Sequence, residues 1–555
     1  MNTKNVAIVV MAVVLVAALS YYVYYATRPE PQEPIPTPSD TLVWAEDISG
    51  TTTFDPGETY SGFNTGMVHY IYDQLITHER SDFSNPVGEA AESWTVSDDG
   101  LVWTFKLREG MKFAGSGNEV TAEDVVYSFN RVVDMVESTA FVFTQLGMTN
   151  TSTVALDKYT VQVTLGQKWA KTIVEQSFAN WVGSIVDSEV VKSKEVDGDF
   201  GSTWLDEHSE GSGPYVLTTF EEGSKLVLDW NENYLKWSGE LKVRDPPQIK
   251  KLIVQSVSES STRKMMLEKG DADVVVGLDE NHLAELSDVE GFDIKHSRTP
   301  SYRGLIMMVL PEYEGQPNPV ADNRVRDAVR YSLDYDAIVE SIYYGFAKKM
   351  QTIIGSDLPG YQALTPYSKD PAKAKALLEE AGYPNGFTLN IMFRDTGDYR
   401  ALAEKLQSDL ADSGITVNFE IVSSAESRAR VRGRDFQSYI TGFGLDYMDP
   451  DAAATAFAHC TSLGSDAPVQ LNAWRAGWVN ETVSAWVDEA RVTSEWEDRA
   501  PLYEKIQEAV LYNGPYAIIL EKPYRYQVTR SWVENHYNHP QWSCDLEIVS
   551  KQEFM

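Results

Sequence analysis

The chain has 555 residues and carries 82 acidic and 47 basic side chains, which gives a net charge of −35. Its length exceeds what one hydrophobic core organises, so it predicts a multi-lobed protein of about three or four structural units. The negative charge argues against a nucleic-acid backbone or an anionic membrane surface as the main partner. It is typical of a body that is soluble in a salty or extracellular medium.

The amino terminus predicts a membrane anchor. Residues 6–26 contain no charged side chain, and a run of about 20 apolar residues lets a helix cross a bilayer. We expect a cytoplasmic tip over 1–5 and an uncleaved transmembrane signal-anchor over 6–26; a cleaved signal peptide is the alternative. Residues 27–40 are rich in proline and predict an extended linker. The expected location is the cell membrane, single-pass, with the globular body extracellular or periplasmic.

The body alternates between strand and helix patterns after the linker. Alternating apolar residues predict strands, and a spacing of three or four predicts helices. This alternation indicates an α/β architecture in lobes, not a barrel or a helical bundle. In chain order the patterns predict a hairpin with its turn at Asp99–Gly100, helices over 121–136, 370–382 and 399–412, and strands over 415–422 and from 438 onward.

Three carboxylates follow the last of these strands in "GFGLDYMDPD", residues 442–451. Ligands of α/β sheets lie beyond the carboxyl ends of strands, so this stretch is a candidate site. Asp449 and Asp451 predict a turn followed by a helix cap, with Asp451 as the cap. The three acids are not expected to form a metal site, because the glycine-spaced loop of calcium sites does not surround them. Asp446 is left as a candidate ligand contact.

Enzyme motifs are absent from the sequence. We find no phosphate-binding loop, no dinucleotide fingerprint, no zinc-protease motif and no nucleophile elbow. Cys460 follows His459, but neighbours in sequence rarely face each other. Cys460 and Cys544, the two cysteines, are predicted either to form one disulfide or to be two buried thiols. The chain therefore reads as a binding protein without a cofactor, and a surface hydrolase with two carboxylates remains a less favoured alternative.

Ordered blocks of the sequence carry a family resemblance. The blocks are "GEAAESWTVSDDGLVWTFKLREGMKFAGSGNEVTAEDVVYSFNRV", "GSGPYVLTTFEEGSKLVLDWNENYLKW", "DNRVRDAVRYSLDYDAIVESIYYGFA" and "DPAKAKALLEEAGYPNGFTLNIMF". In this order they resemble family 5 extracellular solute-binding proteins, the dipeptide, oligopeptide and nickel receptors of ATP-binding-cassette importers. The resemblance covers roughly residues 41–550.

The resemblance implies a two-lobed periplasmic-binding-protein clamshell of type II with an extra domain in the first lobe. Its expected division is lobe I over 41–74, 207–300 and 520–555, the extra domain over 75–206, and lobe II over 301–519.

The implied function is that of a receptor, not an enzyme. It would capture di- or oligopeptides by hinge closure and deliver them to permease subunits with their ATPases. Members of the family also bind oligosaccharides and metal chelates, which are the alternative ligands for the same fold.

The resemblance also implies site residues in lobe II. In "GFGLDY", Asp446 would pair with the α-ammonium of the ligand, Phe443 takes the aromatic position, and the main chain around Gly444 would pair with an extended ligand. A charge-assisted contact of this kind contributes roughly 1.5 to 3 kcal/mol.

Further site residues are implied in both lobes. Arg394 lies on the strand after the "DPAKAKALLEEAGYP" helix, roughly where dipeptide-specific members of the family place an arginine that fixes the ligand carboxylate. A surface position or a pair with Asp395 is the alternative for Arg394. In lobe I, Ser61 and Gly62 of "ETYSGFNTG" would supply main-chain contacts.

Overall fold

The computed structural model describes residues 40–552, except 61, 79–84, 136–137, 235–246, 297–299, 396, 468, 524 and 537–545. The expected transmembrane segment, nearly all of the linker, Ser61 and Cys544 lie outside the described residues. Within the described part of the chain, none of the helices is both long enough and apolar enough to cross a membrane.

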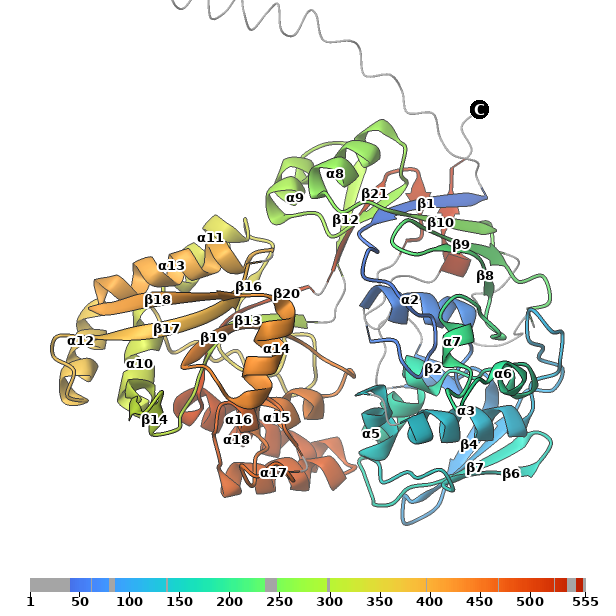
Figure 1. The fold of residues 1–555 in the computed structure, drawn as a ribbon, viewed down its shortest axis with the longest axis horizontal. Helices are drawn as coiled ribbons and strands as arrows, with labels where there is room; N and C mark the ends of the chain where they lie inside the picture. Colours follow the sequence, from blue (N-terminus) through green and yellow to red (C-terminus); the bar gives the residue numbers. More distant parts are fainter. Residues whose placement is uncertain are drawn as a thin grey trace, which may run out of the picture.

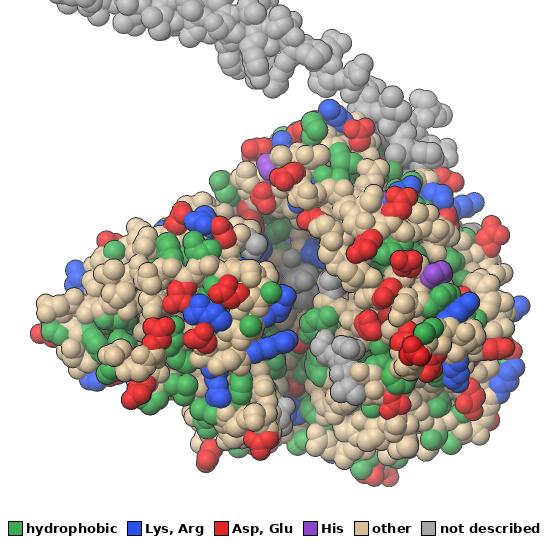
Figure 2. Space-filling view, viewed as in Figure 1, with side chains coloured by type: hydrophobic (Ala, Val, Ile, Leu, Met, Phe, Trp, Pro, Cys, Tyr) green, Lys and Arg blue, Asp and Glu red, His purple; other side chains and the backbone are tan. Residues whose placement is uncertain are grey.

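Two bodies face each other across a hollow (Figures 1 and 2). We call them the first and second lobes. The first lobe contains a mixed seven-stranded sheet, in which β1 runs parallel to both of its neighbours. In spatial order its strands are β12 (Phe292–His296), β21 (Tyr526–Arg530), β11 (Val274–Val276), β1 (Thr41–Glu46), β10 (Lys251–Ser256), β9 (Lys225–Trp230) and β8 (Tyr215–Glu221).

A second, four-stranded antiparallel sheet lies in the lower part of the first lobe (Figure 1). Its order is β4 (Ala91–Val96), β5 (Val102–Leu107), β7 (Thr160–Thr164) and β6 (Thr153–Asp157). The helices of this lobe are α2 (Gly62–Ile71), α3 (Ala122–Met135), α4 (Phe141–Thr144), α5 (Lys171–Phe178), α6 (Ser188–Lys194), α7 (Ser202–Leu205), α8 (Ser260–Lys269) and α9 (Glu280–Ser287).

The second lobe is built on a mixed six-stranded sheet. Its order is β16 (Lys348–Lys349), β20 (Tyr516–Pro523), β13 (Pro300–Met307), β19 (Ser438–Gly444), β17 (Phe387–Arg394) and β18 (Ile415–Val422). Its helices are α10 (Asn323–Ser332), α11 (Tyr335–Ile342), α12 (Pro371–Glu380), α13 (Tyr399–Asp412), α14 (Ser424–Gly433), α15 (Pro450–Ala458), α16 (Asn472–Arg475), α17 (Glu481–Val492) and α18 (Trp496–Asn513).

Three two-stranded ladders complete the described strands. They pair β2 (Ile76–His78) with β3 (Pro86–Gly88), β14 (Glu312–Tyr313) with β15 (Gln316–Pro317), and β22 (Val533–Glu534) with β23 (Ser550–Lys551).

Local sequence signals place the predicted elements correctly. The hairpin joins β4 to β5, and Gly100 has a φ of 77°, which a glycine adopts without strain. At the start of α3 the Asp124 carboxylate accepts hydrogen bonds from the Thr121 amide and hydroxyl. Asp370 caps α12 through the Lys373 amide at 2.9 Å. The predicted hairpin and these two helices are therefore confirmed.

Several separate cores explain the division into lobes. The four-stranded sheet packs with α3 and α5 around one apolar cluster, which Tyr447 and Ala452 of the second lobe join. The six-stranded sheet has one cluster on each face: Ile391 and Phe393 of β17 lie in one, and Met392 between them lies in the other. This alternation is what a strand buried on both faces requires.

The three carboxylates past β19 do not share one role. Asp449 is the N-cap of α15 and accepts from the Asp451 amide at 2.8 Å. Asp451 lies inside the first turn, where it accepts from the Tyr447 hydroxyl at 2.7 Å and faces Arg491. The prediction that Asp451 caps the helix is wrong. Pro450 occupies the first helical position, so the residue before it becomes the cap.

Candidate functional site

A fork between two parallel strands opens toward the first lobe. β17 and β19 pair only at Ile391–Ser438 and Met392–Tyr439. Beyond this point β19 stays paired with β13 as far as Gly444, while β17 stays paired with β18 as far as Arg394. The carboxyl ends of the two strands therefore separate, which is the geometry that creates ligand crevices in α/β sheets. A cavity of about 240 Å³ lies there and is lined by Arg394, Thr441 and Phe443 among others.

Two residues of the "GFG" stretch shape this fork. Phe443 packs into the core, with its ring 4.9 Å from that of Phe457, while also lining the cavity. A Cβ atom on Gly442 would lie 2.5 Å from the Tyr399 hydroxyl and 2.7 Å from the Arg303 guanidinium. A larger residue at this position would push both groups away, so glycine keeps the strand close to them.

Arg394 lies at the end of β17 and lines the same cavity as Phe443. Its guanidinium donates to the Tyr399 hydroxyl at 2.7 Å and stacks over that ring at 4.9 Å. Asp395 pairs instead with Arg400, at 2.7 Å. The alternative pairing of Arg394 with Asp395 is therefore wrong, and the half-buried guanidinium is held at the cavity by an aromatic ring.

Asp446 lies where the two lobes meet. The hydroxyl of Tyr60, in the first lobe, donates to its carboxylate at 2.5 Å, and the Asn180 amide donates to its carbonyl at 3.2 Å. The ring of Tyr60 packs edge-on against Trp181. Burial raises the pKa of Asp446 above its ordinary value of 3.8, and the Tyr60 hydroxyl offsets part of that rise.

One of the two predicted residues of the first lobe, Gly62, lies two residues from Tyr60 in the chain. Gly62 is the first residue of α2 and its carbonyl accepts a hydrogen bond from the Thr65 hydroxyl at 3.3 Å, whereas Ser61 is outside the described residues. The sequence prediction missed Tyr60, the next residue toward the amino terminus. A tyrosine between two nearby glycines, Gly57 and Gly62, was the signal available in the sequence.

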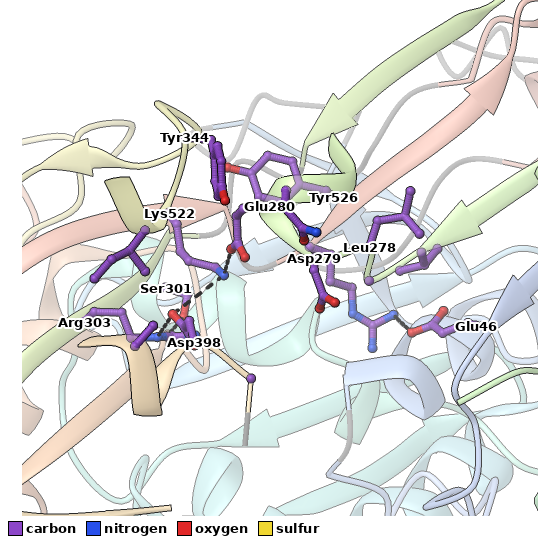
Figure 3. Close-up of a pocket in the computed structure, with 17 residues that line it drawn as sticks. Glu46, Leu278, Asp279, Glu280, Ser301, Arg303, Tyr344, Asp398, Lys522 and Tyr526 are labelled. Atoms are coloured by element: carbon purple, nitrogen blue, oxygen red, sulfur yellow. Dashed lines mark hydrogen bonds and ion pairs between the residues drawn. The ribbon is translucent and has the colours of Figure 1, made fainter. Parts of the chain in front are cut away.

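A second cavity, of about 590 Å³, lies between the lobes beside β13 and β20. Figure 3 shows Lys522 of β20 between Glu280 of α9 and Asp398 of the second lobe. Arg303 donates to Asp398 at 2.8 Å. Burial alone would raise the pKa of Asp398, but Arg303 and Lys522 lower it below its ordinary value. Arg525 pairs with Glu46 at 2.9 Å on the far wall.

The Lys522–Glu280 pair links the lobes, so replacing Glu280 by glutamine is expected to lower the free energy of unfolding by about 1 kcal/mol, between the values of exposed and buried pairs. Glu285→Gln is the matched control, since its partner Lys264 lies in the same lobe and the Glu285 side chain is 56% exposed. Thermal unfolding followed by circular dichroism measures both. Equal midpoints for the two variants would show that the pair does not hold the lobes.

Cys460 is a buried free thiol. Its sulfur donates to the Ser462 carbonyl at 3.3 Å, and burial raises the pKa of the thiol. His459 points to Asp488 instead, at 3.1 Å. The two neighbours therefore have separate partners.

Two α/β lobes facing each other across a cleft define the class of clamshell binding proteins. The family model of bacterial extracellular solute-binding proteins, family 5, matches residues 85–465. The chain belongs to this family, and the resemblance seen in the sequence is confirmed. The protein is therefore a solute-binding receptor that works outside the cytoplasm, and it is not an enzyme.

Individual relatives are similar to this protein over 80 to 92% of its chain. The probable D,D-dipeptide-binding periplasmic protein of Escherichia coli K12 is 27% identical over 493 residues, 88% of this chain and 90% of that protein. Heme-binding protein A of Haemophilus influenzae is 26% identical over 467 residues, 80% of each chain. A periplasmic binding protein from Helicobacter pylori, solved in complex with the peptide STSA, has a TM-score of 0.76 at 25% identity and covers 92% of this chain and 98% of its own.

Proposed function

We propose that this receptor captures a short peptide with a free amino terminus by closing its lobes, and delivers it to an ATP-binding-cassette importer. Asp446 carries the proposal. It is a half-buried carboxylate at the contact between the lobes, and among the described residues no cationic side chain pairs with it. A carboxylate in such a place costs free energy unless a cation joins it. The α-ammonium of a peptide supplies that cation.

The relatives support the ligand class. The names of the Escherichia coli relative and of the Helicobacter pylori complex both state a peptide ligand. The alternative ligands are a metal chelate and an oligosaccharide. The name of one relative, which states heme binding, supports the metal chelate.

Each predicted site residue takes a part in this proposal. Asp446 pairs with the ammonium and Arg394 with the terminal carboxylate, because a guanidinium fork matches a carboxylate. Phe443 borders the ligand, and the main chain at Gly444 pairs with its backbone. Ser61 and Gly62 complete the contact from the first lobe. The common position of Arg394 and Phe443 at one cavity supports this arrangement.

We further propose the expected division of the chain. Lobe I consists of 41–74, 207–300 and 520–555, with the extra domain over 75–206, and lobe II covers 301–519. The separate sheets support this division, with β20 of the second-lobe sheet running on to Pro523, past the proposed boundary at residue 520. Residues 6–26 anchor the protein in the membrane, and the linker over 27–40 holds the body outside. The uncharged run in the sequence supports the anchor.

Isothermal titration calorimetry tests the ligand class. Alanyl-alanine is expected to bind, and its N-acetylated form is expected to bind at least about tenfold more weakly, because acetylation removes the charge that Asp446 pairs with. Equal affinities for the two peptides would contradict the ammonium contact. Binding of a maltooligosaccharide or of heme, with no binding of peptides, would replace the proposed ligand.

The pKa of Asp446 predicts how peptide binding depends on pH. An ammonium pairs with the charged carboxylate only, so the affinity is expected to fall as the pH drops through the raised pKa. The loss therefore begins at a pH above 3.8, the ordinary value of the group. Calorimetry over pH 3 to 7 measures it. The Asp446→Asn variant is the control and should keep only the dependence that comes from the peptide's own carboxylate; the same profile in both proteins would refute the assignment.

A further inference from the structure

The cavity at the fork is lined by positive charge. Arg394 of β17, Arg428 and Arg432 of α14, and Arg475 of α16 all line it, and its lining contains no Asp or Glu. The whole chain carries a net charge of −35. A protein with such a field repels anions at long range, so four guanidinium groups at one small cavity are a local exception.

Two acidic residues near α14 pair with an arginine of this helix that does not line the cavity. Arg430, on the same helix, pairs with Glu420 at 2.5 Å and with Asp435 at 3.2 Å. Among the described residues, neither Arg428 nor Arg432 has an acidic partner within ion-pair distance. The two are four residues apart, on one face of the helix, where like charges destabilise it. Figure 2 shows Lys and Arg side chains gathered over α14 beside the hollow between the lobes.

Two residues that line this cavity carry an unsatisfied buried donor. Asn472 is only 2% exposed, and its side-chain amide nitrogen has no hydrogen-bond partner within the described structure. The buried Nε of Arg475 also has no hydrogen-bond partner within the described structure. Buried donors of native proteins are nearly always paired, because an unmade hydrogen bond costs the full desolvation penalty. Both donors belong to residues at the same cavity.

We propose that this cavity binds a side-chain carboxylate of the ligand, so that the receptor prefers peptides with an acidic carboxyl-terminal residue. The inference rests on the proposed peptide function. Arg394 lines the same cavity and is assigned to the terminal carboxylate of the peptide. A second carboxylate, on the side chain of the peptide's last residue, would therefore meet Arg428, Arg432 and Arg475. The volume of about 240 Å³ suits one residue and not a whole ligand, since complete ligand sites span about 300 to 1,000 Å³.

Calorimetry with alanyl-glutamate and alanyl-glutamine tests this preference. The two peptides have nearly the same shape and differ by one negative charge. The wild-type protein is expected to bind alanyl-glutamate about tenfold more tightly, or more, because two or more guanidinium groups pair with the added carboxylate. Equal affinities would overturn the inference and leave the peptide function standing. If neither peptide bound, the inference and the proposed function would both fall.

A double variant locates the preference. Arg428→Gln with Arg432→Gln is expected to bring the two affinities to within about twofold of each other. Both side chains are exposed, so the fold should be kept, and the thermal unfolding midpoint checks this. Arg324→Gln is the matched control: it removes an exposed arginine of α10 outside the cavity and should keep the full preference. A double variant that folds and keeps the preference would overturn the inference.

Discussion

Replacing Asp446 by asparagine is expected to weaken the binding of a peptide with a free amino terminus by about ten- to a hundredfold. The substitution keeps the size of the side chain and an oxygen that accepts from the Tyr60 hydroxyl, so the contact between the lobes is preserved. It removes the charge that pairs with the ligand. Hydrogen bonds to charged groups contribute about 1.5 to 3 kcal/mol, and each 1.4 kcal/mol corresponds to a factor of ten in affinity.

The controls for this variant separate charge from structure. Asp336→Asn makes the same chemical change on α11, where the side chain is 76% exposed and pairs with Lys349. It should leave peptide affinity unchanged. For an N-acetylated peptide, Asp446→Asn should have little effect, since that ligand has no ammonium to lose. Unchanged calorimetric affinity of Asp446→Asn for the free peptide would show that the ammonium binds elsewhere.

Replacing Arg499 by methionine is expected to lower the free energy of unfolding of the second lobe by about 3 to 5 kcal/mol, the range found when one partner of a buried ion pair is removed. The guanidinium donates to the two oxygens of Asp449 at 2.8 and 2.6 Å, and the two side chains are 2% and 5% exposed. Without Arg499 the carboxylate stays buried and uncompensated. The Thr172 hydroxyl of α5 donates to it at 3.0 Å, so this pair also joins the two lobes.

A second substitution tests the cause of this loss. Asparagine at position 449 keeps a side-chain oxygen that caps α15 but carries no charge. The double variant, Asp449→Asn with Arg499→Met, should therefore be more stable than Arg499→Met alone. Denaturant unfolding followed by circular dichroism gives both values. An Arg499→Met protein as stable as the wild type would show that the pair contributes nothing to the fold.

Elements with local signals could be predicted from the sequence. The Asp-Gly turn of the hairpin, the Thr121–Asp124 box of α3 and the Asp370–Pro371 start of α12 depend on residues next to each other, so a short window contains the information. The cap of α15 also depends on a local signal, because a proline at the first helical position, Pro450, makes the residue before it, Asp449, the cap.

The site could be predicted only in part. Asp446, Phe443 and Arg394 follow strand patterns, and the structure brings the last two to one cavity. The contact between Asp446 and Tyr60 joins residues 386 positions apart, which no local pattern reports. The sequence of α14, including its arginines, looks like that of an ordinary exposed helix. Only the order of strands in the sheet brings this helix beside the ends of β17 and β19.

Mass spectrometry of the ligand released by denaturing the purified protein tests peptide capture most directly. A receptor that closes on its cargo often retains it during purification, because closure buries the ligand and slows its release. We predict that a short peptide with a free amino terminus is recovered, and that its carboxyl-terminal residue is aspartate or glutamate. Recovery of an oligosaccharide or a metal chelate, with no peptide, would contradict the proposed function.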